Sequence, residues 1–315
     1  MEVSVIGLGT FAMGGWSWGG IEIRDAVSAI KNSMENGINL IDTAPIYGKG
    51  LSEEIIGKSI KGLRDKVILA TKCGLVFDIN KGEYFFQYEN LGKVYKYLGP
   101  ESIKKELEDS LKRLGTDYID LYQTHWQDST TEIEVTMDAL MKLKSQGKIR
   151  AIGVSNVSIE QLKKYNSAGE IVSDQEMYSM LDREAEKEIL PWCENTKITF
   201  LAYSPLARGL LTGKMHKNYK FKNNDSRSSD SRFTKENIEK VNNFLKEIDP
   251  ILKNYNINFG QAAISWTLSK YNNVIALCGA RNKDQAINNL QAGDIIFNKD
   301  DVEKIDKVIG KYNIL

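Results

Sequence analysis

The chain has 315 residues, and its 42 basic and 42 acidic side chains give a formal net charge of zero. This length suits one (β/α) barrel or two ordinary domains, and a composition with 42% hydrophobic and 27% charged residues is typical of a globular protein rather than a disordered one. A zero net charge argues against the basic surface through which nucleic-acid-binding proteins attract phosphates.

Short β-branched runs alternate with longer helical patterns along the whole chain. Helical candidates follow the strand-like runs, for example at Arg24–Asn36, Glu53–Ile60, Ile103–Leu114 and Thr131–Ser145. Strands that alternate with helices predict a parallel sheet covered by helices. Eight such units favour a closed (β/α)8 TIM barrel over an open sheet, because closure leaves no edge strands, and we expect one domain over residues 1–315. The eight runs are Val3–Leu8, Ile38–Ile41, Val67–Ala70, Ile119–Gln123, Ile149–Val154, Ile171–Gln175, Ile198–Tyr203 and Val274–Cys278.

Two segments interrupt this alternation. Leu75–Leu98 is rich in Phe and Tyr, and Met215–Phe233 has a composition that we interpret as too polar to pack. Long loops in compact domains are usually lids or binding loops, so both segments are predicted to be functional loops. The alternative is that each is a solvated surface insertion.

The cysteines, the histidines and the length of the apolar runs argue against several further classes of protein. Cys73, Cys193 and Cys278 are too widely spaced for a disulfide framework, which favours reduced thiols in a cytoplasmic protein. The two histidines, His125 and His216, form no metal-binding pair, so no metal site is expected. No apolar run approaches the ~20 residues of a membrane-spanning helix. The first residues lack the basic region of a secretory signal, and we expect no membrane partner.

The first glycine motif is misleading. Gly7-Leu8-Gly9-Thr10-Phe11-Ala12 fits a loose form of the dinucleotide-binding turn, which must open directly into a helix. Four of the next eight residues, from Met13 to Gly20, are glycine, and such a stretch does not hold a helix. We therefore reject a Rossmann domain, and expect these glycines to let the backbone lie close to a ligand.

Ionisable side chains stand at the ends of three successive predicted strands. Asp42 ends the second, Lys72 the third and His125 the fourth, while Tyr47 follows Asp42 by five residues. Active sites of (β/α)8 enzymes lie at the carboxyl ends of the strands, so the four side chains are predicted to meet. A nearby ammonium favours phenolate and lowers a tyrosine pKa, which would suit protonation of an alkoxide during carbonyl reduction. Taken singly, Asp42 could instead be a helix cap, Lys72 a charge on the rim of the barrel and His125 a hydrogen-bonded core histidine.

Three segments carry a family resemblance. Ile41-Asp42-Thr43-Ala44-Pro45-Ile46-Tyr47-Gly48, Ala70-Thr71-Lys72-Cys73 and Leu121-Tyr122-Gln123-Thr124-His125-Trp126 resemble the aldo-keto reductase superfamily. The likeness extends over almost the whole chain and is strongest to the general-stress and inositol-locus reductases of bacteria and to potassium-channel β subunits. It implies that Tyr47 is the general acid, that Lys72 and Asp42 tune it, and that His125 orients the substrate carbonyl.

The resemblance also implies a nicotinamide cofactor. It places Ser155, Asn156 and Gln175 at the nicotinamide carboxamide and Tyr203 against the nicotinamide ring, and it implies preference for NADPH over NADH through Arg281. The remaining cofactor residues that it implies are Thr10, Phe11 and Asp42, then Ser204, Pro205, Leu206, Ala207, Arg208, Gly209, Lys214 and Arg227 near the phosphates, and Gly279, Gln285, Asn288 and Asn289 at the adenosine end.

Substrate and assembly are less defined. We expect Trp16, Trp18, Phe77 and Trp126 to wall a pocket for a small carbonyl compound, together with aromatics such as Tyr84, Phe85 and Phe86. We expect a monomer or a weak homo-oligomer. Members of the family usually begin with a β-hairpin that closes the barrel floor, and about ten residues of this plug are expected to be absent here.

Two rivals to an NADPH-dependent carbonyl reductase remain. The first is a slow-turnover binding protein that senses the cofactor, with which an intact set of four catalytic residues is compatible. The second is a Schiff-base aldolase that uses Lys72, in which the adenosine-end residues would have no role.

Overall fold

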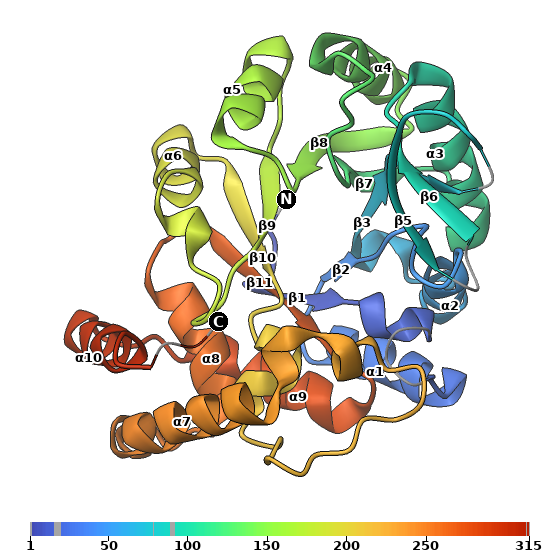
Figure 1. Cartoon of the computed structure of the whole chain (residues 1–315). Coiled ribbons are helices and arrows are strands. Elements are labelled where there is room, and N and C mark those ends of the chain that lie inside the picture. Colours follow the sequence, from blue (N-terminus) through green and yellow to red (C-terminus); the bar gives the residue numbers. More distant parts are fainter. Residues whose placement is uncertain (1, 16–19, 78, 89–91, 313, 315) are drawn as a thin grey trace.

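The fold is a closed barrel of eight parallel strands surrounded by helices (Figure 1). We describe it from a computed structural model, which covers residues 2–15, 20–77, 79–88, 92–312 and 314. Every barrel strand overlaps one of the runs predicted from the sequence, so the predicted (β/α)8 barrel is confirmed. In barrel order the strands are β1 (Ile6–Gly9), β11 (Val274–Gly279), β10 (Thr199–Tyr203), β9 (Ser173–Met177), β8 (Ile149–Ser155), β7 (Ile119–Thr124), β3 (Ile68–Cys73) and β2 (Leu40–Asp42).

The helices pack on the outside of the barrel and bury one face each. In α3, Ile103, Leu107 and Leu114 are fully buried, and the helix begins at Pro100 and ends before Gly115, whose positive φ of 63° suits a helix C-cap. The described helices are α1 (Ile23–Glu35), α2 (Leu51–Ser59), α3 (Pro100–Leu114), α4 (Ile133–Ser145), α5 (Ile159–Ala168), α6 (Ile189–Thr196), α7 (Lys235–Tyr255), α8 (Phe259–Ser269), α9 (Lys283–Gln291) and α10 (Lys299–Ile309).

The apolar core forms two layers. Leu40, Ala70, Leu121, Leu201 and Leu277 fill the inside of the barrel, and a larger cluster packs between the strands and the helices. Successive residues of a strand point alternately into these two layers. Side chains at the carboxyl ends of the strands therefore reach either the mouth of the barrel or the layer behind its wall.

The aromatic segment 75–98 is not a loop, and that prediction was wrong. It folds into a three-stranded antiparallel sheet of β4 (Leu75–Phe77), β6 (Gly92–Lys96) and β5 (Glu83–Tyr88), which lies beside the barrel (Figure 1). The apolar residues Leu75 and Val94 of this sheet pack against Ala44 and Ile46. This contact gives the segment a buried face and allows regular structure.

The segment 215–233 does pack, contrary to the expectation that it is too polar. Two 3₁₀ turns, η5 (Ser226–Ser229) and η6 (Ser231–Phe233), are held by ion pairs, and Phe233 is buried. Arg227 is only 6% exposed because its guanidinium pairs with Asp225, at 3.0 Å and 2.7 Å. Paired charges can be buried where single ones cannot.

Residues 2–5 lie at the floor of the barrel, before β1. Asn39 binds them: its Oδ1 accepts from the Ser4 amide at 2.9 Å, and its Nδ2 donates to the Glu2 carbonyl at 2.9 Å. Val3 packs on the cluster inside the barrel. The residues described before Ile6 form no strand, so the floor is covered by this short segment and not by a hairpin of these residues.

Two further expectations concern the turn after β1 and the cysteines. After β1 comes the 3₁₀ turn η1 (Phe11–Gly14) and not an α-helix, as expected from the rejection of a Rossmann turn. Cys73, Cys193 and Cys278 are free and buried. Among the residues that the structure describes, no helix could cross a membrane, and no group of three or more His, Cys, Asp or Glu side chains could hold a metal ion.

Candidate active site

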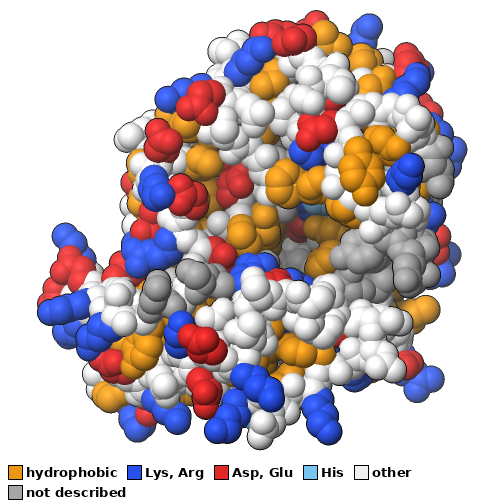
Figure 2. Space-filling model, in the orientation of Figure 1, with side chains coloured by type: hydrophobic (Ala, Val, Ile, Leu, Met, Phe, Trp, Pro, Cys, Tyr) orange, Lys and Arg blue, Asp and Glu red, His pale blue; other side chains and the backbone are white. Residues whose placement is uncertain are grey.

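A cavity of about 980 Å³ opens at the carboxyl ends of the barrel strands. Figure 2 shows it as a hollow near the middle of the molecule. Lys72, Ser155 and Ala207 are buried outside the cavity lining, Phe77 belongs to an aromatic cluster beside it, and Trp16 and Trp18 lie outside the described residues. The predicted residues that line it are Thr10, Phe11, Asp42, Tyr47, His125, Trp126, Asn156, Gln175, Tyr203, Ser204, Pro205, Leu206, Arg208, Gly209, Lys214, Arg227, Gly279, Arg281, Gln285, Asn288 and Asn289.

Lys72 connects the acidic and phenolic side chains. Its Nζ donates to Asp42 Oδ1 at 2.7 Å and to the Thr43 carbonyl at 2.9 Å, and lies 3.5 Å from Tyr47 Oη. These contacts arise because β2 and β3 are neighbours in the barrel. Lys72 is fully buried, so its charge depends on these oxygens for compensation.

The electrostatics differ from one expectation. The pKa of Tyr47 is raised well above its usual value, first by burial and then by the Asp42 carboxylate, whereas the sequence argument predicted a lowered one. Burial also lowers the pKa of Lys72, against the opposing effect of Asp42. Burial and the Lys72 charge hold the pKa of His125 well below its usual value. In the protein alone Tyr47 is therefore a neutral phenol and His125 a neutral imidazole.

Aromatic rings pack against the ring of Tyr47. The ring of His125 stands edge-on to Tyr47 with centroids 6.0 Å apart, and Phe11 does so at 5.1 Å. Trp126 lies 5.0 Å from Phe85, and both pack with Phe77 and Phe86 in the cluster supported by β4 and β6. The antiparallel sheet therefore packs against Trp126, which lines the cavity, and contributes no lining residue of its own among those described.

Asn156 links the strand ends on the other side of Tyr47. Its Nδ2 donates to the His125 carbonyl at 2.9 Å, and its Oδ1 accepts from the Tyr203 hydroxyl at 2.8 Å. Its backbone has a φ of 54°, a left-handed conformation that asparagine tolerates better than most residues. Ser155 does not reach the cavity, but its Oγ donates to the Gln175 carbonyl at 2.7 Å and so fixes the strand beneath.

The loop after β10 has an unusual backbone. Ser204, Ala207 and Arg208 all have positive φ, of 58°, 45° and 54°. Such strain persists only where the surroundings enforce it, and it is frequent at ligand sites. Arg208 pairs with Asp230 at 2.8 Å, and Nη1 of Arg227 donates to the Arg208 carbonyl at 3.0 Å, so the segment 215–233 holds this loop in place.

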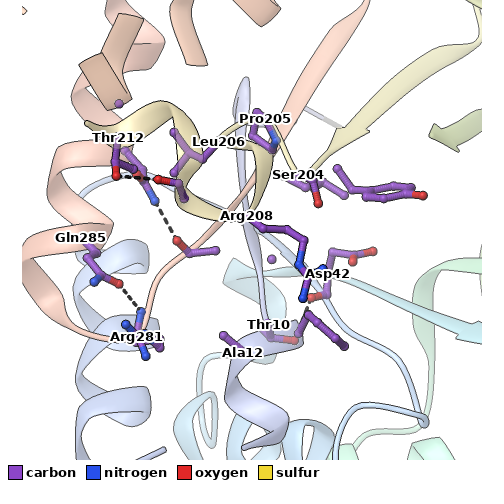
Figure 3. Close-up of a pocket in the computed structure, with 18 of the residues that line it drawn as sticks. Thr10, Ala12, Asp42, Ser204, Pro205, Leu206, Arg208, Thr212, Arg281 and Gln285 are labelled. Carbon is purple, nitrogen blue, oxygen red and sulfur yellow. Dashed lines mark hydrogen bonds between the residues drawn. The ribbon is translucent and has the colours of Figure 1, made fainter. Parts of the chain in front are cut away.

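The far end of the cavity lies between β11 and the start of α9. Figure 3 shows Arg281 and Gln285 there, well separated from Asp42 and Thr10. Gln285 Oε1 accepts from the Arg281 amide at 2.9 Å. The Arg281 guanidinium forms no ion pair with any residue that the structure describes, and Asp284 stands close by in the lining.

Sequence reasoning missed several supporting residues. One of them is Gln123, which donates to Asp42 Oδ2 at 3.2 Å; the predicted Gln175 donates to the same atom at 2.8 Å. Gln123 could have been found, because it follows Leu121 by two residues and therefore faces the same interior. Ser52 donates to Thr10 Oγ1 at 2.8 Å, and only tertiary structure brings these two together. Thr212 and Asn282 stand between residues assigned to the cofactor, and Met215 and Tyr219 belong to the predicted functional loop. The lining residues that were missed altogether are Gly9, Ala12, Asn258, Phe259, Gly260 and Leu277.

Comparisons with known proteins agree with this geometry. The profile of the aldo/keto reductase family matches residues 5–310. The chain is 43% identical to the aldo-keto reductase YhdN of Bacillus subtilis over 288 residues, covering 90% of this chain and 83% of that protein. It is 40% identical to the NADH-specific methylglyoxal reductase of Escherichia coli over 301 residues, covering 94% and 91%.

Solved structures show the same fold. A glycerol dehydrogenase from Gluconobacter oxydans superposes with a TM-score of 0.89 at 37% identity, covering 100% of this chain and 94% of that one. An aldo/keto reductase from Klebsiella pneumoniae, solved with NADP and acetate, superposes with a TM-score of 0.72 at 27% identity, covering 98% and 92%. The chain belongs to the aldo/keto reductase family and is an oxidoreductase of carbonyl compounds.

Proposed function

We propose that the protein reduces aldehydes or ketones to alcohols with NADPH, and that Tyr47 is the general acid. The observation that carries this proposal is the buried series of contacts from Asp42 through Lys72 to the Tyr47 hydroxyl, which opens with His125 onto the cavity. It joins a proton donor, a fixed positive charge and a hydrogen-bonding imidazole at one point.

The residues of the chain perform the proton chemistry. Bound NADPH supplies the hydride to the carbonyl carbon. The neutral Tyr47 phenol keeps its proton until an alkoxide forms, and a strongly basic alkoxide accepts it even from a phenol of raised pKa. Lys72, oriented by Asp42 and Thr43, then stabilises the phenolate, which regains a proton from solvent. Neutral His125 donates a hydrogen bond to the carbonyl oxygen without adding a charge.

The lining fits a nicotinamide dinucleotide. A cavity of about 980 Å³ is at the upper end of the range of ligand pockets, roughly 300–1,000 Å³. Asn156 and Gln175 would bind the carboxamide and Tyr203 would stack on the ring. The strained loop from Ser204 onward, with Lys214, would take the phosphates through backbone N–H groups and a positive charge.

Arg281 supports the choice of NADPH over NADH. A guanidinium can bind the 2′-phosphate in a two-pronged manner, and this one has no carboxylate partner among the described residues. Asp284 nearby opposes the choice, and the relative from Escherichia coli is named as NADH-specific. Arg281→Ala is expected to weaken NADPH binding by about tenfold or more, the loss typical of a charged hydrogen bond, and to leave NADH binding within about twofold. Equal losses for both cofactors would contradict the assignment.

Steady-state assays test the reaction. We expect NADPH oxidation with 4-nitrobenzaldehyde, and methylglyoxal is a useful second substrate because it is named for one relative. Tight NADPH binding with almost no turnover on any of a panel of aldehydes and ketones would instead favour the cofactor-sensing alternative. We propose a monomer or a weak homo-oligomer as the working form.

A further inference from the structure

Two carboxyl side chains, the buried Asp174 and the half-buried Glu176, lie behind the barrel wall and outside the cavity lining. Asp174 and Glu176 alternate with Gln175 on β9 and therefore point away from the barrel interior. The register places Asp174 between Val154 on β8 and Phe200 on β10, both of them core residues. Asp174 is fully buried, and neither of its carboxyl oxygens has a hydrogen-bond donor among the described residues.

The pair can exist there only if it retains a proton. Burial raises the pKa of Asp174 well above its usual value, and the neighbouring Glu176 raises it further. Burial raises the pKa of Glu176 to about 7. The carboxyls in turn help to raise the pKa of the Cys193 thiol on α6, and Glu176 helps to raise that of Tyr203 on β10; neither of these groups carries a positive charge. Among the residues described, no Lys or Arg forms an ion pair with either carboxyl. A protonated Asp174 would have a hydroxyl to donate to Glu176, which lies two residues along on the same face of β9.

Glu176 has a second contact, which leads to the cavity. Its Oε1 accepts from the backbone amide of Val157 at 2.8 Å, directly after Asn156. Asn156 has the left-handed backbone and links the His125 carbonyl to the Tyr203 hydroxyl. A strained residue of this kind persists only when neighbouring contacts enforce it. Glu176 supplies such a contact from behind the barrel wall, on the side of the turn that faces away from the cavity.

We propose that Glu176 is a positioning residue for the nicotinamide end of the cofactor, and that it acts by anchoring the turn at Asn156 and Val157 while sharing a proton with Asp174. The anchor sets where the Asn156 amide and, through it, the Tyr203 ring stand. This inference rests on the proposed function, because these two side chains are assigned to the nicotinamide there.

Glu176→Ala tests the anchor, with Glu176→Gln as its conservative counterpart. In the protein without cofactor, we expect hydrogen exchange at Val157 to become about tenfold faster in the alanine variant, and to stay near the wild-type rate in the glutamine variant, whose amide oxygen still accepts. The NADPH dissociation constant, measured by nucleotide fluorescence, is expected to rise about tenfold in Glu176→Ala and less than threefold in Glu176→Gln. The KM for the carbonyl substrate should change by less than twofold.

A second pair of variants tests the shared proton. Asp174→Asn keeps a donor for Glu176, so NADPH binding is expected to stay within about threefold of wild type. Asp174→Leu suits the apolar layer but removes the donor, and we expect it to weaken NADPH binding by about fivefold or more. Cys193→Ala serves as the matched control, because it removes a buried side chain beside the pair without touching the turn. It should lower the melting temperature and leave the dissociation constant unchanged.

The outcomes separate this inference from the proposed function. A wild-type protein that binds neither NADPH nor NADH would refute the proposed function, whereas the exchange experiment needs no cofactor. The proposed role of Glu176 as an anchor is refuted if Glu176→Ala leaves hydrogen exchange at Val157 and the NADPH dissociation constant unchanged. It is also refuted if Glu176→Gln speeds exchange and weakens NADPH binding as much as Glu176→Ala does. Equal behaviour of Asp174→Leu and Asp174→Asn would refute the shared proton.

Discussion

Replacing Tyr47 by Phe separates the chemical step from cofactor binding. The change removes one oxygen whose contact with a described residue is the 3.5 Å approach to Lys72 Nζ, at the weak end of hydrogen-bond distances. We therefore expect the free energy of unfolding to change by less than about 1 kcal/mol. The ring remains, so its packing against Phe11 and His125 is retained.

The effect on catalysis is expected to be much larger. Loss of a general acid reduces a rate by about 10²–10⁴-fold, equivalent to roughly 3–5 kcal/mol of barrier. Burial and Asp42 both keep Tyr47 protonated, so the loss should not vary with pH between about 6 and 9. The assay is single-turnover oxidation of NADPH in the presence of 4-nitrobenzaldehyde, with cofactor affinity measured separately by fluorescence.

Tyr203→Phe is a matched control within the same cavity. It removes the hydroxyl that donates to Asn156 at 2.8 Å, so NADPH affinity is expected to fall about fivefold, the usual value of one hydrogen bond, while the rate of the chemical step stays within about threefold. A Tyr47→Phe variant that retains more than about a tenth of the wild-type single-turnover rate would refute the role of Tyr47 as general acid.

Three further predictions concern other parts of the molecule. Asn39→Ala should lower the melting temperature by several degrees, through loss of about 2 kcal/mol from two hydrogen bonds, and leave kcat/KM within about twofold; an unchanged melting temperature would contradict the role of this contact. The segment 215–233 is expected to act as a lid that closes over the cofactor phosphates. Stopped-flow fluorescence of NADPH binding should therefore show a unimolecular step that Arg227→Ala removes. A single second-order phase in the wild-type protein would contradict the lid. Burial raises the pKa of Glu106 from 4.5 to about 7, so the folded protein binds this proton more tightly and loses stability as pH rises across that window; Glu106→Gln should gain stability relative to wild type there, which thermal melts at several pH values can check.

The barrel, and the meeting of Asp42, Lys72 and His125 at one end of it, were predictable from the sequence because both depend on local order. A buried parallel strand reads as a β-branched run, and residues just after such runs meet at one end of the barrel, which is how Asp42, Lys72 and His125 were recognised. Their protonation was not predictable. Burial and the Asp42 carboxylate raise the pKa of Tyr47, and the extent of burial cannot be inferred from the spacing of residues in the sequence.

The predictions for the two inserted segments, 75–98 and 215–233, were wrong because they too depended on contacts made in the folded protein. In Glu83–Tyr88 polar and aromatic residues do not alternate strictly, so the strand signal is weak, and its pairing with β6 depends on a surface supplied by Ala44 and Ile46. The segment 215–233 is polar in composition, but some of its charged residues pair with each other, as Arg227 does with Asp225, and the composition alone does not reveal such pairs. Likewise, an acidic residue at an outward position of β9, Asp174, is recognised as exceptional only when its apolar neighbours are known.

The cavity can form only after β1 has paired with β11, so it requires both ends of the chain. Gly9 lies opposite Gly279 across this seam, so Thr10 from the beginning of the sequence and Arg281 from near its end border the same hollow. During synthesis the emerging polypeptide cannot complete this cavity, the proposed nucleotide site, until β11 has docked beside β1. A dinucleotide at about 100 times its dissociation constant would add roughly 2.7 kcal/mol to the closed barrel alone. Occupancy by cofactor would thus distinguish finished molecules from truncated or half-assembled ones, and cells that hold the nucleotide in excess would protect the former selectively from proteolysis.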